Sequence, residues 1–200
     1  MEHLSHWISA GALTIVIVCW IAFAATFLFR AKPPLTKDAV NAPKSWLGIV
    51  LQGFAYFPVW AIPRRPFFSP FVDSLYGLNI ALQLLGAALS IVCVVLTIRA
   101  VQELGKQWSL EARLVEGHEL VTTGPYSLVR HPIYAAMLGM LIATGIVLSY
   151  WAIIIGAVVV FLIGTFIRTR FEERLLREAF GEQFERWRSR VPGLIPFLKF

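Results

Sequence analysis

The chain has 200 residues, of which 58% are hydrophobic and only 15% are charged, well below the roughly 25% of a soluble domain. This composition excludes an ordinary soluble domain and predicts an all-α integral membrane protein folded as one compact bundle. The net charge of +6 follows the expected membrane topology, so it is weak evidence for nucleic acid, and no nucleic-acid partner is expected.

Four long stretches without charge define the expected membrane spans: residues 8–29, 46–62, 75–98 and 133–167. A spanning helix needs about 20 apolar residues, so the last stretch is too long for one span. We expect it to form two spans, 133–149 and 151–167, joined by a tight turn at Ser149-Tyr150-Trp151. The sequence therefore predicts about five transmembrane helices. The first stretch is expected to be a span and not a cleaved signal peptide, because no Lys or Arg precedes it.

The positions of lysine and arginine predict the orientation. If the N-terminus lies outside, only Arg64 and Arg65 fall on the outer side, and every other basic residue falls on the cytoplasmic side. The positive-inside rule favours this orientation, with a cytoplasmic C-terminus. The outer loop that carries these two arginines is interpreted as a segment at headgroup level, with no chemistry assigned to it.

The polar residues gather in two cytoplasmic segments, the loop 99–130 and the tail 168–200. Two Leu-Val pairs around Glu-Gly-His-Glu predict a small hairpin in the loop, which is long enough to suggest a function. Apolar residues in the tail recur at intervals of three and four. They predict amphipathic helices that continue the last span, with a break near Gly181 and an end before Pro192.

The sequence Arg130-His131-Pro132 stands where the fourth span begins. Proline is common in the first turn of a helix, but cations there oppose the helix dipole at a cost of up to about 1 kcal/mol each. One interpretation is simple positive-inside anchoring. The other is an anion site, in which free backbone N–H groups, Arg130 and His131 converge on a carboxylate or phosphate.

Glu172 and Glu173 begin the tail just after Arg168. The Arg168–Glu172 and Glu173–Arg177 spacings suit ordinary i,i+4 pairs on a solvated helix face. Alternatively, a carboxylate near the membrane surface would receive an ammonium group or ribose hydroxyls. Arg168 itself is interpretable either as a snorkelling anchor or as a substrate clamp at the bilayer edge.

The remaining candidates have ordinary explanations too. His118 suits a surface turn, and Tyr126 and Tyr134 suit interfacial aromatic belts. Cys19 and Cys93 lie inside expected spans, so they predict neither a disulfide framework nor a metal site, and no metal is expected. No phosphate-binding loop or nucleophile motif occurs. These observations favour a ligand site on the cytoplasmic face and leave its reaction open.

The stretch "GHELVTTGPYSLVRHPIYAAML", followed by "RTRFEERLLREAFGEQFERWRSRVPGLIPF", resembles the isoprenylcysteine carboxyl methyltransferase family and its prokaryotic relatives. The resemblance covers about residues 105–198, nearly half the chain. It implies a prokaryotic inner membrane or its equivalent as location, and S-adenosyl-L-methionine as methyl donor. It also implies a cytoplasmic cofactor pocket within residues 105–200, closed by the C-terminal amphipathic helices and open sideways to lipid.

The resemblance also implies roles for individual residues. Arg168 falls where the family places a substrate-orienting arginine. Arg130 joins the cofactor site through the anion-site interpretation. A glutamine that the family uses before the hairpin has no match here, since 111–113 occupy that region. The cofactor contacts implied by position are His118, Glu119, Leu120, Val121, Tyr126, His131, Pro132, Ile133, Tyr134 and Glu172.

These assignments favour carboxyl O-methylation of an isoprenoid or lipid-borne acceptor that enters from the bilayer. A carboxylate is already ionised at neutral pH, whereas an amine must first lose a proton. N-methylation of an amino-lipid such as phosphatidylethanolamine remains an alternative. So do an NADPH-dependent enzyme resembling sterol reductases and a non-enzymatic lipid-binding membrane protein.

Overall fold

The computed structural model describes residues 2–28, 40–41, 46–64, 76–105, 113–114 and 119–196. Its order of elements is α1 Glu2–Leu28, β1 Val40–Asn41, α2 Trp46–Ala61, α3 Tyr76–Leu104, β2 Arg113–Leu114, the 3-10 helix η3 Gly124–Ser127, α4 Pro132–Leu148, α5 Trp151–Phe180 and α6 Glu182–Arg190. The helical content and the long apolar helices confirm the predicted all-α integral membrane protein.

Among the described residues, three helices are long and apolar enough to cross a membrane: α1, α3 and α5. Two shorter apolar helices, α2 and α4, correspond to the other expected spans. Helix α4 ends at Leu148 and α5 begins at Trp151, which confirms the turn predicted at 149–151.

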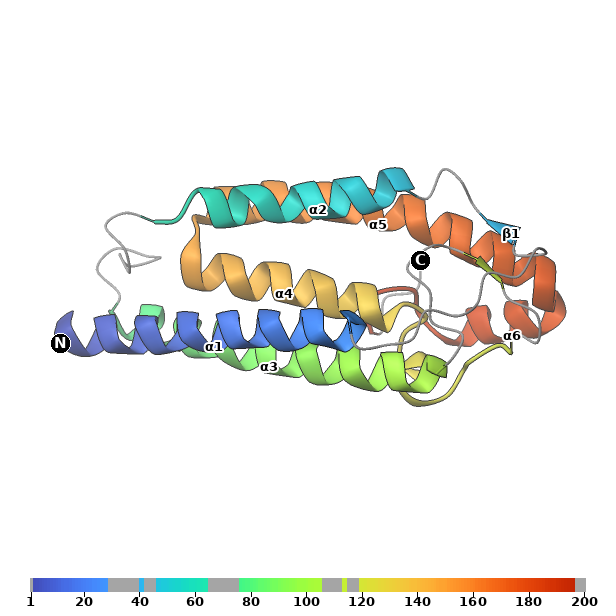
Figure 1. The fold of residues 1–200 in the computed structure, drawn as a ribbon, viewed down its shortest axis with the longest axis horizontal. Helices are drawn as coiled ribbons and strands as arrows, with labels where there is room; N and C mark the ends of the chain where they lie inside the picture. The colour runs from blue at the N-terminus through green and yellow to red at the C-terminus, as the bar shows by residue number, and fades with distance from the viewer. Residues whose placement is uncertain are drawn as a thin grey trace.

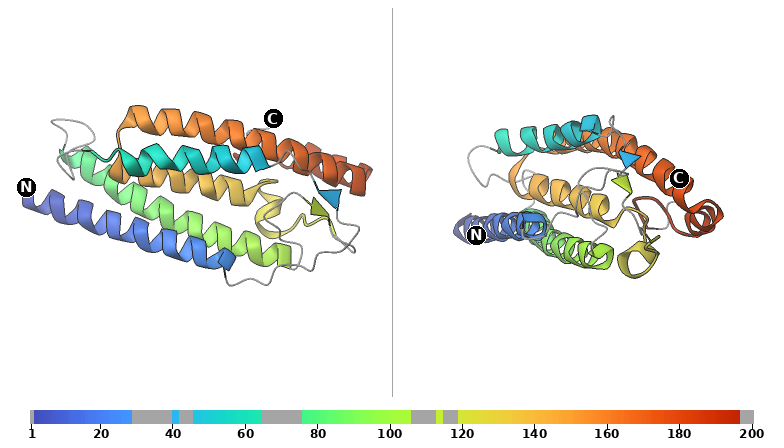
Figure 2. Two further views of the ribbon diagram at one scale, coloured as in Figure 1. Left: turned by 45° about the horizontal axis from the view of Figure 1, so that its top comes forward. Right: turned by 45° about the vertical axis from the view of Figure 1, so that its right-hand side comes forward.

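The helices form two layers on either side of α4 (Figure 1). Helix α2 lies along α5 in one layer, α1 lies along α3 in the other, and both views of Figure 2 show α4 between them. Helix α4 is buried on all sides, with residues such as Met140, Leu141 and Ala143 fully enclosed. This explains why its sequence is apolar all round and carries no polar stripe.

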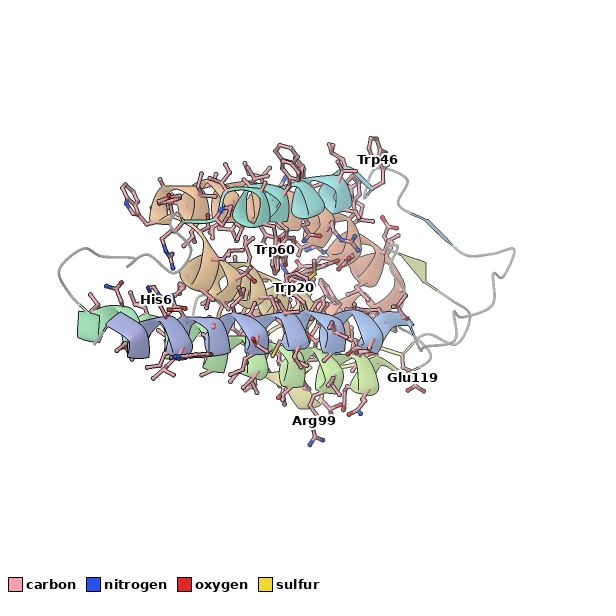
Figure 3. All side chains as sticks on the ribbon, turned by 60° about the vertical axis from the view of Figure 1, so that its left-hand side comes forward. His6, Trp20, Trp46, Trp60, Arg99 and Glu119 are labelled. Atoms are coloured by element: carbon pink, nitrogen blue, oxygen red, sulfur yellow. The ribbon has the colours of Figure 1, made fainter. Side chains whose placement is uncertain are left out.

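Glycines bring α2 and α5 together within one layer, and hydrogen bonds join the layers to α4. A Cβ at Gly48 would lie 2.6 Å from the Gly164 carbonyl oxygen, so α2 and α5 cross with their backbones in contact. Trp20 donates to Thr144 at 3.0 Å, and the Tyr56 hydroxyl donates to the Met137 carbonyl at 2.8 Å. Figure 3 shows Trp20 and Trp60 directed toward the space between the layers, where their rings meet edge-on.

The outer loop contributes a cap that the sequence interpretation missed. Arg64 is only 3% exposed, and its guanidinium donates to the carbonyl oxygens of Ile146, Val147 and Ser149 at the end of α4. Helix C-termini leave carbonyls without intrahelical partners and attract cations. Arg64 therefore holds the described end of this loop against the α4–α5 turn, with its guanidinium bound to protein carbonyls.

The predicted hairpin in the inner loop is wrong. β2 Arg113–Leu114 pairs antiparallel with β1 Val40–Asn41 of the preceding inner loop, whereas Leu120 and Val121 have no regular structure. The pairing joins segments more than 70 positions apart, and a local pattern of Leu-Val pairs does not encode it. Residues 115–118, including the predicted turn, lie outside the described part of the chain.

The tail follows the predicted pattern. Helix α5 continues without interruption past the end of the apolar run to Phe180, and Gly181 adopts a positive φ of 48° that ends it. Helix α6 then turns back and ends at Arg190, before Pro192. Helix α6, the start of α4 and the two short strands all lie at one end of the bundle, at the right of Figure 1, far from the N-terminus.

Candidate functional site

The segment that precedes α4 is attached to the C-terminal end of α3. Gly124 has φ +56°, and a Cβ there would lie 3.0 Å from a carboxylate oxygen of Glu103. The Thr123 hydroxyl donates to that same carboxylate at 2.5 Å. The turn of η3 then buries Tyr126, whose carbonyl accepts a hydrogen bond from the Trp187 indole at 3.2 Å. These contacts place residues 130–134 beside α5 and α6.

Pro132 occupies the first turn of α4, as its sequence position predicted. The two residues before it pair with the C-terminal segment through their backbones: Arg130 N–H donates to Pro192 at 2.8 Å, and His131 N–H donates to Gly193 at 3.0 Å. The Arg130 guanidinium also donates to the Val191 carbonyl at 2.5 Å. The segment after α6 is therefore fastened to the start of α4.

The two basic side chains at the start of α4 face two carboxylates on α5. Arg130 Nε lies 2.8 Å from Glu173 Oε1, and His131 Nε2 lies 3.1 Å from the same oxygen. On its other side, His131 Nδ1 lies 3.6 Å from Glu172 Oε2. The sequence placed two basic groups at the positive end of the α4 dipole, which is unfavourable. The two glutamates offset this cost, because they supply negative charge at the same place.

A second group of contacts lies deeper, at the end of the apolar part of α5. Arg168 Nε donates to the Tyr134 hydroxyl at 2.7 Å, and Arg168 Nη2 lies 3.3 Å from Glu172 Oε1. The Tyr134 hydroxyl in turn donates to Glu172. Arg168 is 4% exposed and Tyr134 9%, whereas the Glu172 side chain is 22% exposed. Glu172 is thus the accessible member of this group.

Close packing of α2 fixes the position of Arg168. A Cβ on Gly48 would lie 2.5 Å from Arg168 Cγ, so only glycine allows α2 to cover this side chain so closely. One turn earlier on α5, Thr165 accepts a hydrogen bond from the buried Gln52 amide at 2.9 Å. Buried polar groups of this kind are expensive in a membrane and usually functional.

The polar extension of α5 carries a strongly stabilised carboxylate. Partial burial alone would raise the pKa of Glu173, but hydrogen bonds and charge interactions with His131 and Arg130 outweigh it and lower the pKa to about 2. The guanidinium of Arg188 also lies 3.3 Å from Glu173 Oε2. Burial also raises the pKa of Tyr126, and the Glu172 and Glu103 charges raise it further, so Tyr126 stays a neutral phenol.

The structure brings together many of the residues singled out in the sequence. Arg130, His131, Tyr134, Arg168 and Glu172 form one connected cluster. Pro132 and Tyr126 are buried near it, and Ile133, Leu120 and Val121 are half-buried. Glu119 is exposed and points away from the bundle, as Arg99 does (Figure 3). His118 lies outside the described residues. The Arg168–Glu172 pair forms as its spacing predicted.

Glu173 is the residue whose importance the sequence interpretation missed. We expected it to pair with Arg177, but Arg177 pairs with Glu185 of α6 at 2.5 Å, while Glu173 turns toward α4. The available signal was that Glu173 directly follows Glu172, so two carboxylates stand four and five residues after Arg168. Among the described residues, no group of three or more His, Cys, Asp or Glu side chains is placed to hold a metal ion.

The fold and the cluster define an all-helical integral membrane protein with a partly accessible carboxylate, Glu172, beside the buried Arg168, Tyr134 and His131. Comparison with known proteins gives the family. A family model described as phospholipid methyltransferase matches residues 81–183, just over half of the chain. The chain belongs to this family. The matched region contains the whole cluster but excludes α1, α2 and α6 from Phe184 onward.

Individual relatives agree with this assignment. The protein-S-isoprenylcysteine O-methyltransferase B of Arabidopsis thaliana is 34% identical over 89 residues, 44% of this chain and 45% of that protein. The protein-S-isoprenylcysteine O-methyltransferases of Mus musculus and Rattus norvegicus are each 37% identical over 84 residues, 41% of this chain and 29% of theirs. The alignments thus span less than half the length of each relative.

Proposed function

We propose that this chain is an integral membrane methyltransferase that uses S-adenosyl-L-methionine and methylates an isoprenoid or lipid-borne carboxylate. The observation that carries the proposal is the cluster in which Arg168, Tyr134 and His131 surround Glu172. The cluster stands in the part of the chain that matches the family. Family membership supports the use of a methyl donor. The resemblance to the isoprenylcysteine carboxyl methyltransferase family supports S-adenosyl-L-methionine as that donor.

The residues present fit the donor. Its ammonium group needs an anion, and the Glu172 carboxylate is partly accessible while being held in place by Tyr134 and Arg168. Its carboxylate needs hydrogen-bond donors, and His131 lies beside Glu172. The half-buried Leu120 and Val121 suit the edge of an adenine. When bound, the donor's sulfonium supplies an activated methyl group, so the chain's task is to align the groups and exclude water.

Arg168 would hold the acceptor carboxylate. Its guanidinium lies where the apolar run of α5 ends, so an acceptor with its tail in the bilayer would reach it from the side. Arg168 is always protonated and needs no titration to bind a carboxylate at neutral pH. A carboxylate held by Arg168 would already be ionised at neutral pH, so the chain need supply no general base.

The proposal includes a location for the site. We infer five membrane-crossing helices, with the N-terminus outside and the cluster at the cytoplasmic end of the bundle, in a prokaryotic inner membrane or its equivalent. The basic residues of α5 and α6 on this end support that orientation through the positive-inside rule. Helix α6 and the segment 191–193 would form the wall that closes the cofactor pocket.

A second candidate is N-methylation of an amino-lipid. The description of the matching family favours it, because it names a phospholipid methyltransferase. The site also offers groups for the required proton removal, since Glu172 and His131 lie side by side. An amine acceptor would lose its proton to one of them before attacking the methyl group.

One experiment separates these reactions. The full chain in detergent is incubated with membrane lipid extract and donor labelled in the methyl group, and the labelled lipids are then treated with base. A methyl ester releases the label as volatile methanol, whereas an N-methyl group retains it. Release is the result we expect. Retained label favours the second candidate, and the absence of any labelled lipid removes the proposal.

The cofactor is tested separately by thermal unfolding in detergent. Saturating S-adenosylhomocysteine at about 100 times its dissociation constant should stabilise the protein by roughly 2.7 kcal/mol. A shift with NADPH instead would support a reductase and contradict our proposal. No shift with either ligand would favour a lipid-binding protein without enzymatic activity.

A further inference from the structure

The outward face of α5 is apolar for most of its length and becomes basic at one level. Ile155, Val159, Ile163 and Phe166 are each more than half exposed and recur at intervals of three and four residues, so they line one face of the helix. In an integral membrane protein such a face contacts lipid. The next two positions along this face are arginines, Arg170 and Arg174, and both are exposed.

The first of these arginines is held in place by the last apolar residue. The guanidinium carbon of Arg170 lies 4.4 Å from the centroid of the Phe166 ring, in a cation–π contact. This contact keeps the charge at the boundary between the apolar and basic parts of the face. Arg170 is therefore positioned at the level expected for the headgroups of the bilayer.

Neither arginine is neutralised by the part of the protein that the structure describes. Among the described residues, no carboxylate lies within ion-pair distance of Arg170 or Arg174, whereas the next basic residue on this face, Arg177, is paired with Glu185. Arg168 and Glu172 point to the opposite side of α5, into the cluster with Tyr134. The two unpaired cations thus belong to the lipid-facing side and not to the candidate site.

We propose that Arg170 and Arg174 bind the phosphate of an anionic phospholipid whose acyl chains lie along the apolar face of α5. A soluble phosphate would meet the two cations but not the apolar stripe below them, so the complete surface fits a lipid in the bilayer. The bound headgroup fixes the depth of α5 at the membrane surface, and with it the depth of Arg168 and Glu172 on the other side of the same two turns.

The test uses the purified full chain, loaded with a mixture of phosphatidylglycerol and phosphatidylcholine and analysed by native mass spectrometry. The variant Arg170→Gln/Arg174→Gln should retain less phosphatidylglycerol, by roughly fivefold for each arginine, with phosphatidylcholine unchanged. The variant Arg170→Lys/Arg174→Lys should retain most of the binding. Helical content measured by circular dichroism establishes that each variant is folded.

The matched control is Arg186→Gln/Arg190→Gln, which removes the same charge from exposed positions on α6. We expect it to retain phosphatidylglycerol as the unaltered chain does. An equal or larger loss in this control, or no loss in the Arg170/Arg174 variant, overturns the proposal. Inorganic phosphate at millimolar concentration should not displace the lipid, and complete displacement would also overturn it. Each of these outcomes is a lipid-retention measurement that needs no methyl transfer, so failure of this proposal is distinguishable from failure of the proposed function.

Discussion

Arg130 and Glu173 form an ion pair of 2.8 Å that joins the start of α4 to the polar extension of α5, across 43 positions of the chain. The same glutamate oxygen lies 3.1 Å from His131, so this pair also fixes the imidazole beside Glu172. The candidate site therefore depends on a carboxylate, Glu173, that is itself held by Arg130, His131 and Arg188. Separate variants distinguish the structural role of the Arg130–Glu173 pair from direct contact with the donor and the acceptor.

Replacing Glu172 should impair donor binding more than folding. The Glu172→Gln change keeps the size of the side chain but removes the charge expected to hold the donor's ammonium. A hydrogen bond to a charged group contributes about 1.5–3 kcal/mol, so affinity for S-adenosylhomocysteine should fall roughly 10- to 100-fold. Isothermal titration calorimetry in detergent measures this. Glu178→Gln, an exposed change on the same helix, is the control and should bind normally.

Replacing Glu173 should destabilise the protein. Arg130 has a side chain only 5% exposed, and Glu173→Ala would leave it without its carboxylate partner. Removing one partner of a buried pair costs about 3–5 kcal/mol, which thermal unfolding in detergent would detect. Glu185→Gln, which removes an exposed partner of Arg177, should change the unfolding temperature little. Similar unfolding of the two variants would show that the Arg130–Glu173 pair is not structural.

Acid should weaken this end of the bundle through Glu173. Its pKa is about 2 in the folded chain against an ordinary value of 4.5, so the unfolded chain binds the proton more tightly. The stabilisation from Glu173 is therefore complete above about pH 4.5 and is lost as the pH falls toward 2. In unfolding experiments across this range, Glu173→Gln should show a smaller decline in stability than the unaltered chain. Parallel declines would contradict the pKa assignment.

Replacing Arg168 tests the proposed hold on the acceptor. Arg168→Lys keeps the charge, but a lysine cannot reproduce the two-pronged contact with Tyr134 and Glu172. Methyl transfer should fall at least tenfold, with a larger effect on the KM of the acceptor than on that of the donor. Arg170→Lys, on the opposite side of the helix, should leave both constants unchanged. An unaltered acceptor KM in Arg168→Lys would remove Arg168 from acceptor binding.

Replacing Arg64 should affect stability alone. The Arg64→Gln change removes the guanidinium that caps the end of α4 and leaves buried carbonyl oxygens short of donors, at a cost of about 1–3 kcal/mol. Thermal unfolding should show the loss, while S-adenosylhomocysteine binding by the folded fraction should stay normal, because the site is at the other end of the bundle. The exposed Arg99→Gln serves as the charge-matched control.

The sequence by itself determined the helices. Apolar runs set their number and approximate positions, Pro132 marked the start of α4, and Gly181 marked the break between α5 and α6. These features are local: helix capping, proline geometry and hydrophobic periodicity act within a few residues, so they can be read from the order of residues alone. The resemblance also located most of the cluster, because its motifs stand at fixed spacings within one half of the chain.

Only the tertiary structure decided which distant groups meet. The partner of Glu173 is Arg130 and not Arg177, β2 pairs with β1 and not with 120–121, and Arg64 caps α4 from the outer loop. For Glu173 and β2 the local pattern allowed a plausible neighbour, and the packing of separate segments supplied a different one; for Arg64 the local pattern indicated no partner. Ion pairs and hydrogen bonds form between groups that are close in space, and the packing of the helices determines which groups are close.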